Sequence, residues 1–131
     1  MATKTNALIS IVDDDESVRE ALEDLIQSVG FRVRGFPSAM DFLAFPDIRD
    51  TSCVIADVNM PGMSGVELSR RLTELGHAIP TILITAFPKE RTRARALEDG
   101  VVCYLIKPFD DDALIGCVCS ALQDDETGAG A

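Results

Sequence analysis

The chain has 131 residues, of which 47% are hydrophobic, so it can fill the core of one domain and has no room for a second. Its 12 Lys and Arg against 22 Asp and Glu give a formal net charge of −10, which argues against direct binding to nucleic acid or to an anionic membrane. No apolar run approaches the roughly 18 to 20 residues that cross a bilayer, and the first six residues lack a signal-peptide pattern, so we expect a cytoplasmic protein.

Five short β-branched runs alternate along the chain with helix-length stretches. The runs occupy residues 7–12, 31–36, 52–58, 80–86 and 101–106. Because runs that are nearly all apolar suit a parallel sheet covered on both faces, this alternation predicts an α/β fold, a doubly wound five-stranded parallel sheet with five helices. In such a fold ligands bind beyond the carboxyl ends of the strands.

The first helical stretch has an apolar residue at i, i+3, i+4, i+7, i+8 and i+11, which is one stripe facing a sheet. The stripe consists of Val18, Ala21, Leu22, Leu25, Ile26 and Val29. A capping box of Ser17 with Glu20 is predicted to start this helix, and Gly30 to end it. Ser64 with Glu67 predicts a second capping box after the third strand.

The two last helical stretches differ in apolar content. The final one carries a stripe of Leu114, Cys117, Val118, Ala121 and Leu122. The stretch over 88–99 is interrupted by Lys89, Arg91, Arg93 and Arg95. Little apolar area is left on it, so we expect this helix to be the least firmly docked and its surface to change during function. Its basic side chains could receive an acidic partner face, or be a solvated helix face.

Cysteines occupy positions 53, 103, 117 and 119, two in strand-like runs and two in the last helical pattern. None shows the paired C-x-x-C spacing of a zinc site. Free cysteine is often buried in protein cores, so we interpret all four as reduced thiols.

Polar residues gather at four predicted strand ends. The first strand ends in Asp13, Asp14 and Asp15, the third in Asp57, the fourth in Thr85 and the fifth in Lys107. Each residue alone has an ordinary role as a cap, a turn residue or a solvated charge. Independent caps and turns need not coincide at four strand ends, so their conjunction favours a site.

The acidic residues at this edge predict a metal ion. Placing Asp13, Asp14 and Asp57 along one edge of a sheet is unfavourable unless a cation neutralises them. The candidate ligands are oxygens, which favours Mg²⁺, or Mn²⁺ in its place, over zinc. Carboxylates, a metal, a lysine and a hydroxyl together are the parts needed for phosphoryl transfer to an aspartate.

Four separated segments resemble those of one known family. They are residues 11–15 (IVDDD), 56–65 (ADVNMPGMSG), 85–86 (TA) and 104–109 (YLIKPF). These motifs are similar to those of the receiver domain of bacterial two-component response regulators, most of all the nitrogen-fixation regulators. The resemblance covers 7–122 and implies a flavodoxin-like strand order, 2-1-3-4-5. It leaves 1–6 as an N-terminal extension and 123–131 as a disordered tail.

The resemblance implies a role for each acidic residue. Asp57 would accept the phosphoryl group, and Asp14 and Asp57 would bind Mg²⁺ directly, with the backbone carbonyl of Asn59 as the remaining protein ligand. Asp13 would be the acidic residue beyond these direct ligands. The donor would be a sensor histidine kinase or a histidine phosphotransfer protein, and the signal would pass to a downstream protein partner.

The resemblance also implies roles for residues on the last two strands. Thr85 would donate a hydrogen bond to the phosphoryl group, Lys107 would pair with it, and Tyr104 would turn inward after phosphorylation. The bond between Lys107 and Pro108 is usually cis in this family. Such a protein is no enzyme beyond its own phosphorylation and dephosphorylation, and Phe87, at the mouth of the site, would shield the phosphoryl group from water.

Three alternatives remain open from the sequence. A phosphatase of the haloacid-dehalogenase type would need an Asp two positions after the nucleophile, where this chain has Asn59, and a cap domain for which there is no length. A flavodoxin-like cofactor binder would have to tolerate three aspartates in its phosphate loop. The third alternative is a receiver fragment of a longer DNA-binding transcriptional regulator.

Overall fold

The computed structural model describes residues 6–130, with side chains described through residue 122. The strands are β1 (Leu8–Val12), β2 (Arg32–Phe36), β3 (Thr51–Asp57), β4 (Thr81–Thr85) and β5 (Cys103–Ile106). The helices are α2 (Glu16–Ser28), α3 (Ala39–Leu43), α4 (Gly65–Glu74), α5 (Glu90–Glu98) and α6 (Asp111–Gly130), with a 3-10 turn η1 (Ile48–Asp50) before β3. Every strand pairing is parallel and the order is β2-β1-β3-β4-β5, so the predicted fold and strand order are confirmed.

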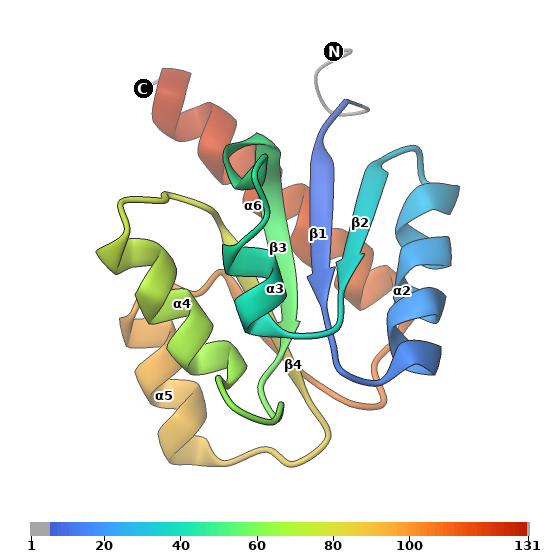
Figure 1. Cartoon of the computed structure of the whole chain (residues 1–131). Helices are drawn as coiled ribbons and strands as arrows, with labels where there is room; N and C mark the ends of the chain where they lie inside the picture. Colours follow the sequence, from blue (N-terminus) through green and yellow to red (C-terminus); the bar gives the residue numbers. More distant parts are fainter. Residues whose placement is uncertain (1–5, 131) are drawn as a thin grey trace.

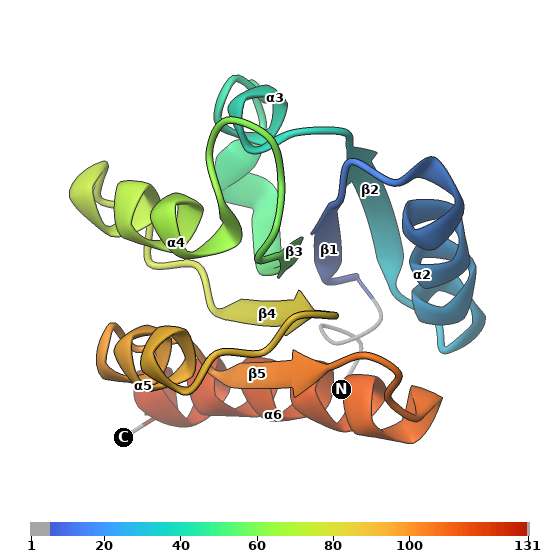
Figure 2. The ribbon, with the colours of Figure 1, turned by 90° about the horizontal axis from the view of Figure 1, so that it is seen from below.

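Helices cover both faces of the sheet, as Figures 1 and 2 show. Alternate strand residues supply the two cores: on β3, Cys53 and Ile55 pack with α2 and α6, whereas Val54 and Ala56 pack with α3, α4 and α5. This alternation follows from the two-residue period of a strand. Both faces of the central strands are therefore buried, which explains their nearly continuous apolar sequence.

The helix starts follow local side-chain chemistry, with one correction to the sequence prediction. Ser64 and Glu67 form the predicted capping box of α4. The start of α2 is capped by Asp15 instead of Ser17, because Asp15 Oδ1 accepts hydrogen bonds from the backbone N–H groups of Ser17 (2.9 Å) and Val18 (3.2 Å). A carboxylate is as good an N-cap as a hydroxyl, and Asp15 precedes Ser17 by two residues, so α2 starts directly after Asp15. Gly30, with φ 100°, ends α2 as predicted.

The cysteine interpretation was wrong for two of the four residues. The structure joins Cys103 on β5 to Cys117 on α6 in a disulfide, with Cα atoms 6.2 Å apart. Spacing in the sequence could not reveal this pair, because the packing of α6 against the sheet brings the two residues together. Cys53 and Cys119 are free thiols, and burial raises the pKa of Cys53 to about 12.

The chain ends are only partly described. Residues 1–5 of the expected N-terminal extension lie outside the described residues. The backbone of α6 continues to Gly130, where we predicted a disordered tail from residue 123, and the domain boundaries stay a prediction. No helix in the described part of the chain is long and apolar enough to cross a bilayer.

Candidate functional site

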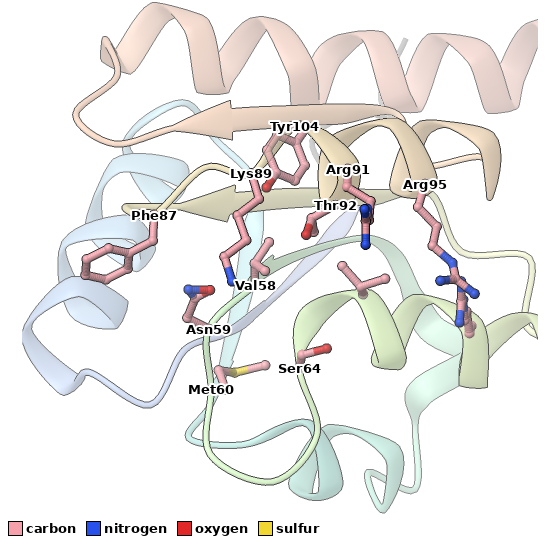
Figure 3. A pocket seen from close by; sticks show the side chains of 12 residues that line it. Val58, Asn59, Met60, Ser64, Phe87, Lys89, Arg91, Thr92, Arg95 and Tyr104 are labelled. Carbon is pink, nitrogen blue, oxygen red and sulfur yellow. The ribbon is translucent and has the colours of Figure 1, made fainter.

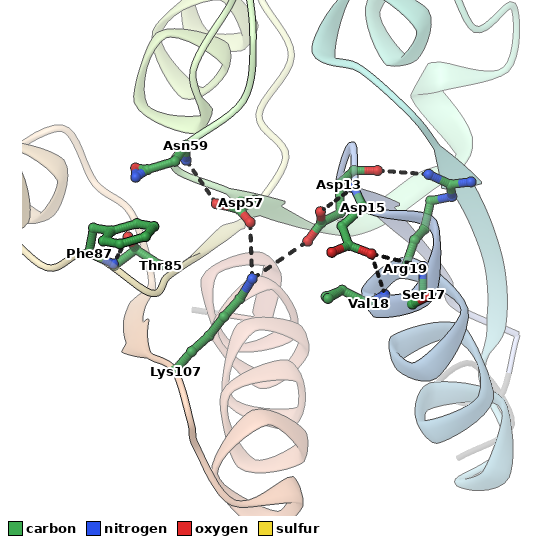
Figure 4. Close-up of polar contacts among 10 residues, drawn as sticks. All are labelled: Asp13, Asp15, Ser17, Val18, Arg19, Asp57, Asn59, Thr85, Phe87 and Lys107. Atoms are coloured by element: carbon green, nitrogen blue, oxygen red, sulfur yellow. Dashed lines mark hydrogen bonds and ion pairs between the residues drawn. The ribbon is translucent and has the colours of Figure 1, made fainter.

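The carboxyl ends of β1, β3, β4 and β5 meet at one edge of the sheet, where Figure 4 shows the polar side chains. Lys107, just beyond β5, points its ammonium group between two carboxylates that lie far away in the sequence. Its Nζ donates a hydrogen bond to Asp57 Oδ2 at 3.0 Å and lies 3.9 Å from Asp13 Oδ2. The lysine side chain is 24% exposed and the Asp57 side chain 10%. This half-buried cation is a strong electrostatic partner for both acids, because solvent screens it incompletely.

Asp57 is held in a fixed orientation at the end of β3. While Oδ2 faces Lys107, Oδ1 accepts a hydrogen bond from the backbone N–H of Asn59 at 2.8 Å. The start of α4 then approaches the same strand end closely, since a Cβ added to Gly65 would lie 2.6 Å from the carbonyl oxygen of Asp57. Gly65 is a positioning residue that we missed, although the 56–65 motif contains it.

Asp13 is fully buried and carries an electrostatic penalty. Its pKa rises from 3.8 to about 6, mainly because burial removes the carboxylate from water, and the charges of Asp57 and Asp14 raise it further. The backbone N–H of Asp15 and the nearby Lys107 lower it in part. Oδ1 accepts the Asp15 hydrogen bond at 2.9 Å, but Oδ2 is buried with no hydrogen-bond partner.

The unpartnered oxygen of Asp13 fits a hard cation. The donors at this edge are the carboxylates of Asp13 and Asp57, with the charge of Asp14 close enough to affect Asp13. Asp14 and Asn59 themselves are solvent-exposed. Among the residues with described side chains, no three acidic, His or Cys side chains converge into a ready-made metal cluster. Of the predicted ligands, Asp13 and Asp57 are brought together through Lys107, whereas the roles of Asp14 and of the Asn59 carbonyl stay predictions.

A further positioning residue, Arg19, was absent from our sequence prediction. From the first turns of α2, its Nη1 donates a hydrogen bond to the backbone carbonyl of Asp13 at 2.8 Å. The contact holds the turn between β1 and α2 that presents Asp13 to the site. Its six-residue spacing from Asp13 was the only available sequence signal, and that spacing has no special meaning without the turn geometry.

Thr85 and Tyr104, the two predicted switch residues, make no side-chain hydrogen bond to Asp57. Thr85 is fully buried, and its Oγ1 accepts a hydrogen bond from the backbone N–H of Phe87 at 3.0 Å. Tyr104 is half-buried beside α5, and its hydroxyl is buried without a hydrogen-bond partner. Phe87 is 70% exposed in the β4–α5 loop. The bond between Lys107 and Pro108 is cis, as the resemblance implied.

Sequence comparison places this geometry in one family. The model of the response regulator receiver domain matches residues 9–118. Response regulator protein TmoT of Ectopseudomonas mendocina is 40% identical over 117 residues, which cover 89% of this chain and 53% of TmoT. Transcriptional regulatory protein FixJ of Rhizobium meliloti is 40% identical over 115 residues, covering 87% of this chain and 56% of FixJ. The chain therefore spans about half the length of the curated relatives it matches.

Structural comparison agrees. The crystal structure of FixJ-N is 39% identical in sequence, and the match covers 90% of this chain and 94% of FixJ-N with a TM-score of 0.83. The family match includes all four strand ends that form the site, and so confirms the resemblance read from the motifs. The chain thus belongs to the response regulator receiver domain family.

Proposed function

We propose that this domain is a Mg²⁺-dependent phosphorylation switch. It accepts a phosphoryl group on Asp57 from a sensor histidine kinase or a histidine phosphotransfer protein, and then offers a changed surface to a downstream protein partner. The observation that supports this most directly is the 3.0 Å hydrogen bond from Lys107 Nζ to Asp57 Oδ2, with the buried carboxylate of Asp13 beside it. A carboxylate, a cation and a second acidic side chain beside them are what an aspartyl-phosphate site requires.

In the proposed reaction one carboxylate oxygen of Asp57 forms the new O–P bond while the P–N bond to the donor histidine breaks. Lys107 compensates the negative charge that arrives with the phosphoryl group, and the N–H of Asn59 orients the carboxylate for attack. Receiver domains use Mg²⁺ in this transfer, where it supplies charge neutralisation of the moving oxygens. The ion, or Mn²⁺ in its place, would be held by Asp57 and Asp14, with the carbonyl of Asn59 and the nearby Asp13.

The proposed conformational change starts at Thr85. Its hydroxyl oxygen accepts the Phe87 N–H, so the hydroxyl proton stays available for a phosphoryl oxygen on Asp57. Moving Thr85 toward that oxygen would release the β4–α5 loop. Tyr104, which lies beside α5 with an unpartnered hydroxyl, would then move further inward. Only Ala96 anchors α5 as a buried residue, so this helix can shift at low cost.

The domain is proposed to catalyse only its own phosphorylation and dephosphorylation. We place it in the cytoplasm, where its kinase partners have ATP.

The greater length of the relatives supports a second proposal, that the chain is the receiver part of a longer DNA-binding transcriptional regulator. The coding sequence beyond residue 131 decides between a stand-alone receiver and such a fragment. A haloacid-dehalogenase-like activity would show as turnover of p-nitrophenyl phosphate, which we expect to be absent.

The test is phosphorylation of the purified chain by acetyl phosphate, followed by intact-mass measurement. Wild type with Mg²⁺ should gain one acid-labile phosphoryl group, excess chelator should prevent the gain, and Asp57→Asn should show none. Asp41→Asn, an exposed carboxylate in α3, is the matched control and should be phosphorylated like wild type. An adduct that persists in Asp57→Asn, or that forms undiminished in chelator, would contradict the proposal.

A further inference from the structure

A groove of about 440 Å³ lies between α4 and α5, next to the proposed phosphorylation site, and shares Asn59 and Phe87 with its border. Figure 3 shows the 12 side chains that line it. Four of them are basic: Arg70, Lys89, Arg91 and Arg95. None of the lining residues is acidic, although the whole chain carries 22 acidic residues against 12 basic ones. A third of the basic residues of an acidic protein therefore line one groove, which we call the basic groove.

Most of this positive charge has no partner within the described residues. Arg70 pairs with Asp99 at 3.1 Å, but no salt bridge is recorded for Lys89, Arg91 or Arg95. Two of these cations also sit at the start of α5, where a helix dipole favours negative charge. Lys89, the N-cap residue, makes no side-chain capping hydrogen bond. An anionic group in the groove would relieve both unfavourable arrangements.

The floor of the basic groove is apolar. Val58 and Met60 are buried there, and Tyr104 lies beside them with its hydroxyl buried and without a hydrogen-bond partner. An occupant thus needs carboxylates for the basic rim and apolar atoms for the floor.

The spacing of the cations favours a polypeptide over a small anion. Lys89 and Arg95 are six residues apart along the helix direction, which at about 1.5 Å per residue separates them by about 9 Å. A single phosphate would have to draw these long side chains together, whereas a peptide segment with several carboxylates can pair with them where they lie. Arg91 and Arg95, four residues apart, lie on one face of α5 and would meet the same segment.

We propose that the basic groove docks an acidic segment of a partner protein, with an apolar side chain of that segment on the floor of Val58 and Met60. The inference rests on the proposed function for its regulation, because Asn59 and Phe87 also line the groove. Asn59 donates to Asp57, and Phe87 donates to Thr85, so phosphorylation would move two walls of the groove.

The test uses the full chain and a fluorescent model peptide of alternating Glu and Leu residues, with fluorescence anisotropy as the readout. Binding should weaken with salt, and Arg91→Ala and Arg95→Ala should each reduce affinity by about 2- to 5-fold, as expected for exposed ion pairs. The matched control is Arg93→Ala, which removes the same charge from the same helix but does not line the groove. This control should change affinity by less than about 2-fold.

Three results would overturn the docking proposal: equal losses in the Arg93 and Arg95 variants, equal binding of a peptide with Gln in place of Glu, or full displacement by pyrophosphate, which would indicate a small-anion site. Wild type that self-associates through Arg91 and Arg95 in sedimentation would instead assign the groove to a second copy of this chain, which also overturns the proposal.

The peptide is also titrated into Asp57→Asn, so that failure of the docking and failure of the proposed function can be told apart. If the peptide binds Asp57→Asn through the arginines but wild type forms no aspartyl phosphate, the docking proposal stands and the proposed function fails. If wild type forms an aspartyl phosphate but no arginine-dependent peptide binding is seen, the docking proposal alone fails.

Discussion

The acidic strand ends and the basic groove are adjacent regions of opposite charge, and burial makes them energetically different. Asp13 is fully buried, and its charge costs free energy in the absence of a cation. Lys89, Arg91 and Arg95 are exposed, so water screens their mutual repulsion. Clustered like charges therefore lower the free energy of unfolding at the buried strand ends. In the exposed groove they mainly determine which ligands bind.

The largest expected effect comes from removing the buried charge. Asp13→Asn keeps the shape and the acceptor for the Asp15 N–H. At about 1.36 kcal/mol per pH unit, a rise of the Asp13 pKa from 3.8 to about 6 corresponds to about 3 kcal/mol. We therefore expect the variant to gain up to about 3 kcal/mol in free energy of unfolding at pH 7, measured by urea denaturation in chelator.

The pH dependence of wild-type stability follows from the direction of the Asp13 pKa shift. The folded state holds the Asp13 proton to a higher pH than the unfolded state does. The Asp13 contribution to wild-type stability is therefore present below about pH 4 and lost as the pH rises to about 6. Asp13→Asn should lack this decline. Parallel stability curves for the two proteins between pH 4 and 7 would contradict the assigned cost of Asp13.

The next effect tests the cation that pairs with the carboxylates of both Asp13 and Asp57. Lys107→Ala leaves Asp13 and Asp57 without their shared ammonium group. We expect a loss of about 2 kcal/mol in chelator, below the range for fully buried pairs because Lys107 is partly exposed. Mg²⁺ should recover part of it. The control is Lys89→Ala in the groove, which should change the free energy of unfolding by less than about 0.5 kcal/mol. Equal losses in the Lys107 and Lys89 variants would contradict the difference between the two regions.

A smaller effect concerns the lifetime of the phosphorylated state, between the two regions. Phe87 is an exposed aromatic ring near the site and cannot orient an attacking water. Phe87→Glu should speed aspartyl-phosphate loss by about 10-fold, if orientation is worth about 1.4 kcal/mol. Phosphoryl decay is measured at matched Mg²⁺, with Phe87→Leu as an apolar control. A Glu variant that decays at the wild-type rate, or more slowly, would show that Phe87 does not shield the site.

The smallest effect lies within the basic groove itself. Arg70→Ala breaks the ion pair with Asp99 and should lower the free energy of unfolding by up to about 1 kcal/mol. Arg95→Ala breaks no recorded pair and replaces one good helix former by another, so its stability should stay within about 0.5 kcal/mol of wild type. Thermal unfolding of both variants checks this. A larger loss in the Arg95 variant would mean that the groove contributes to folding.

The sequence by itself determined the order of elements and the residues at the strand ends. Apolar runs and helical stripes report local periods, and these periods predicted the five strands, the helices and the positions of Asp57 and Lys107 at two strand ends. Short-range signals also have limits within one element, as α2 shows: both Asp15 and Ser17 are good caps, and only the backbone geometry selects Asp15.

Tertiary structure alone decided which of these residues are buried and paired. Asp13 and Asp14 are neighbours in the chain, yet the end of β1 buries the first and exposes the second. Packing of α6 on the sheet joined Cys103 to Cys117, and the approach of α4 to α5 assembled the basic groove. Burial and pairing depend on residues that are far apart in the chain: Asp57 and Lys107 are separated by 50 positions. Such residues come into contact only when the sheet and its helices pack.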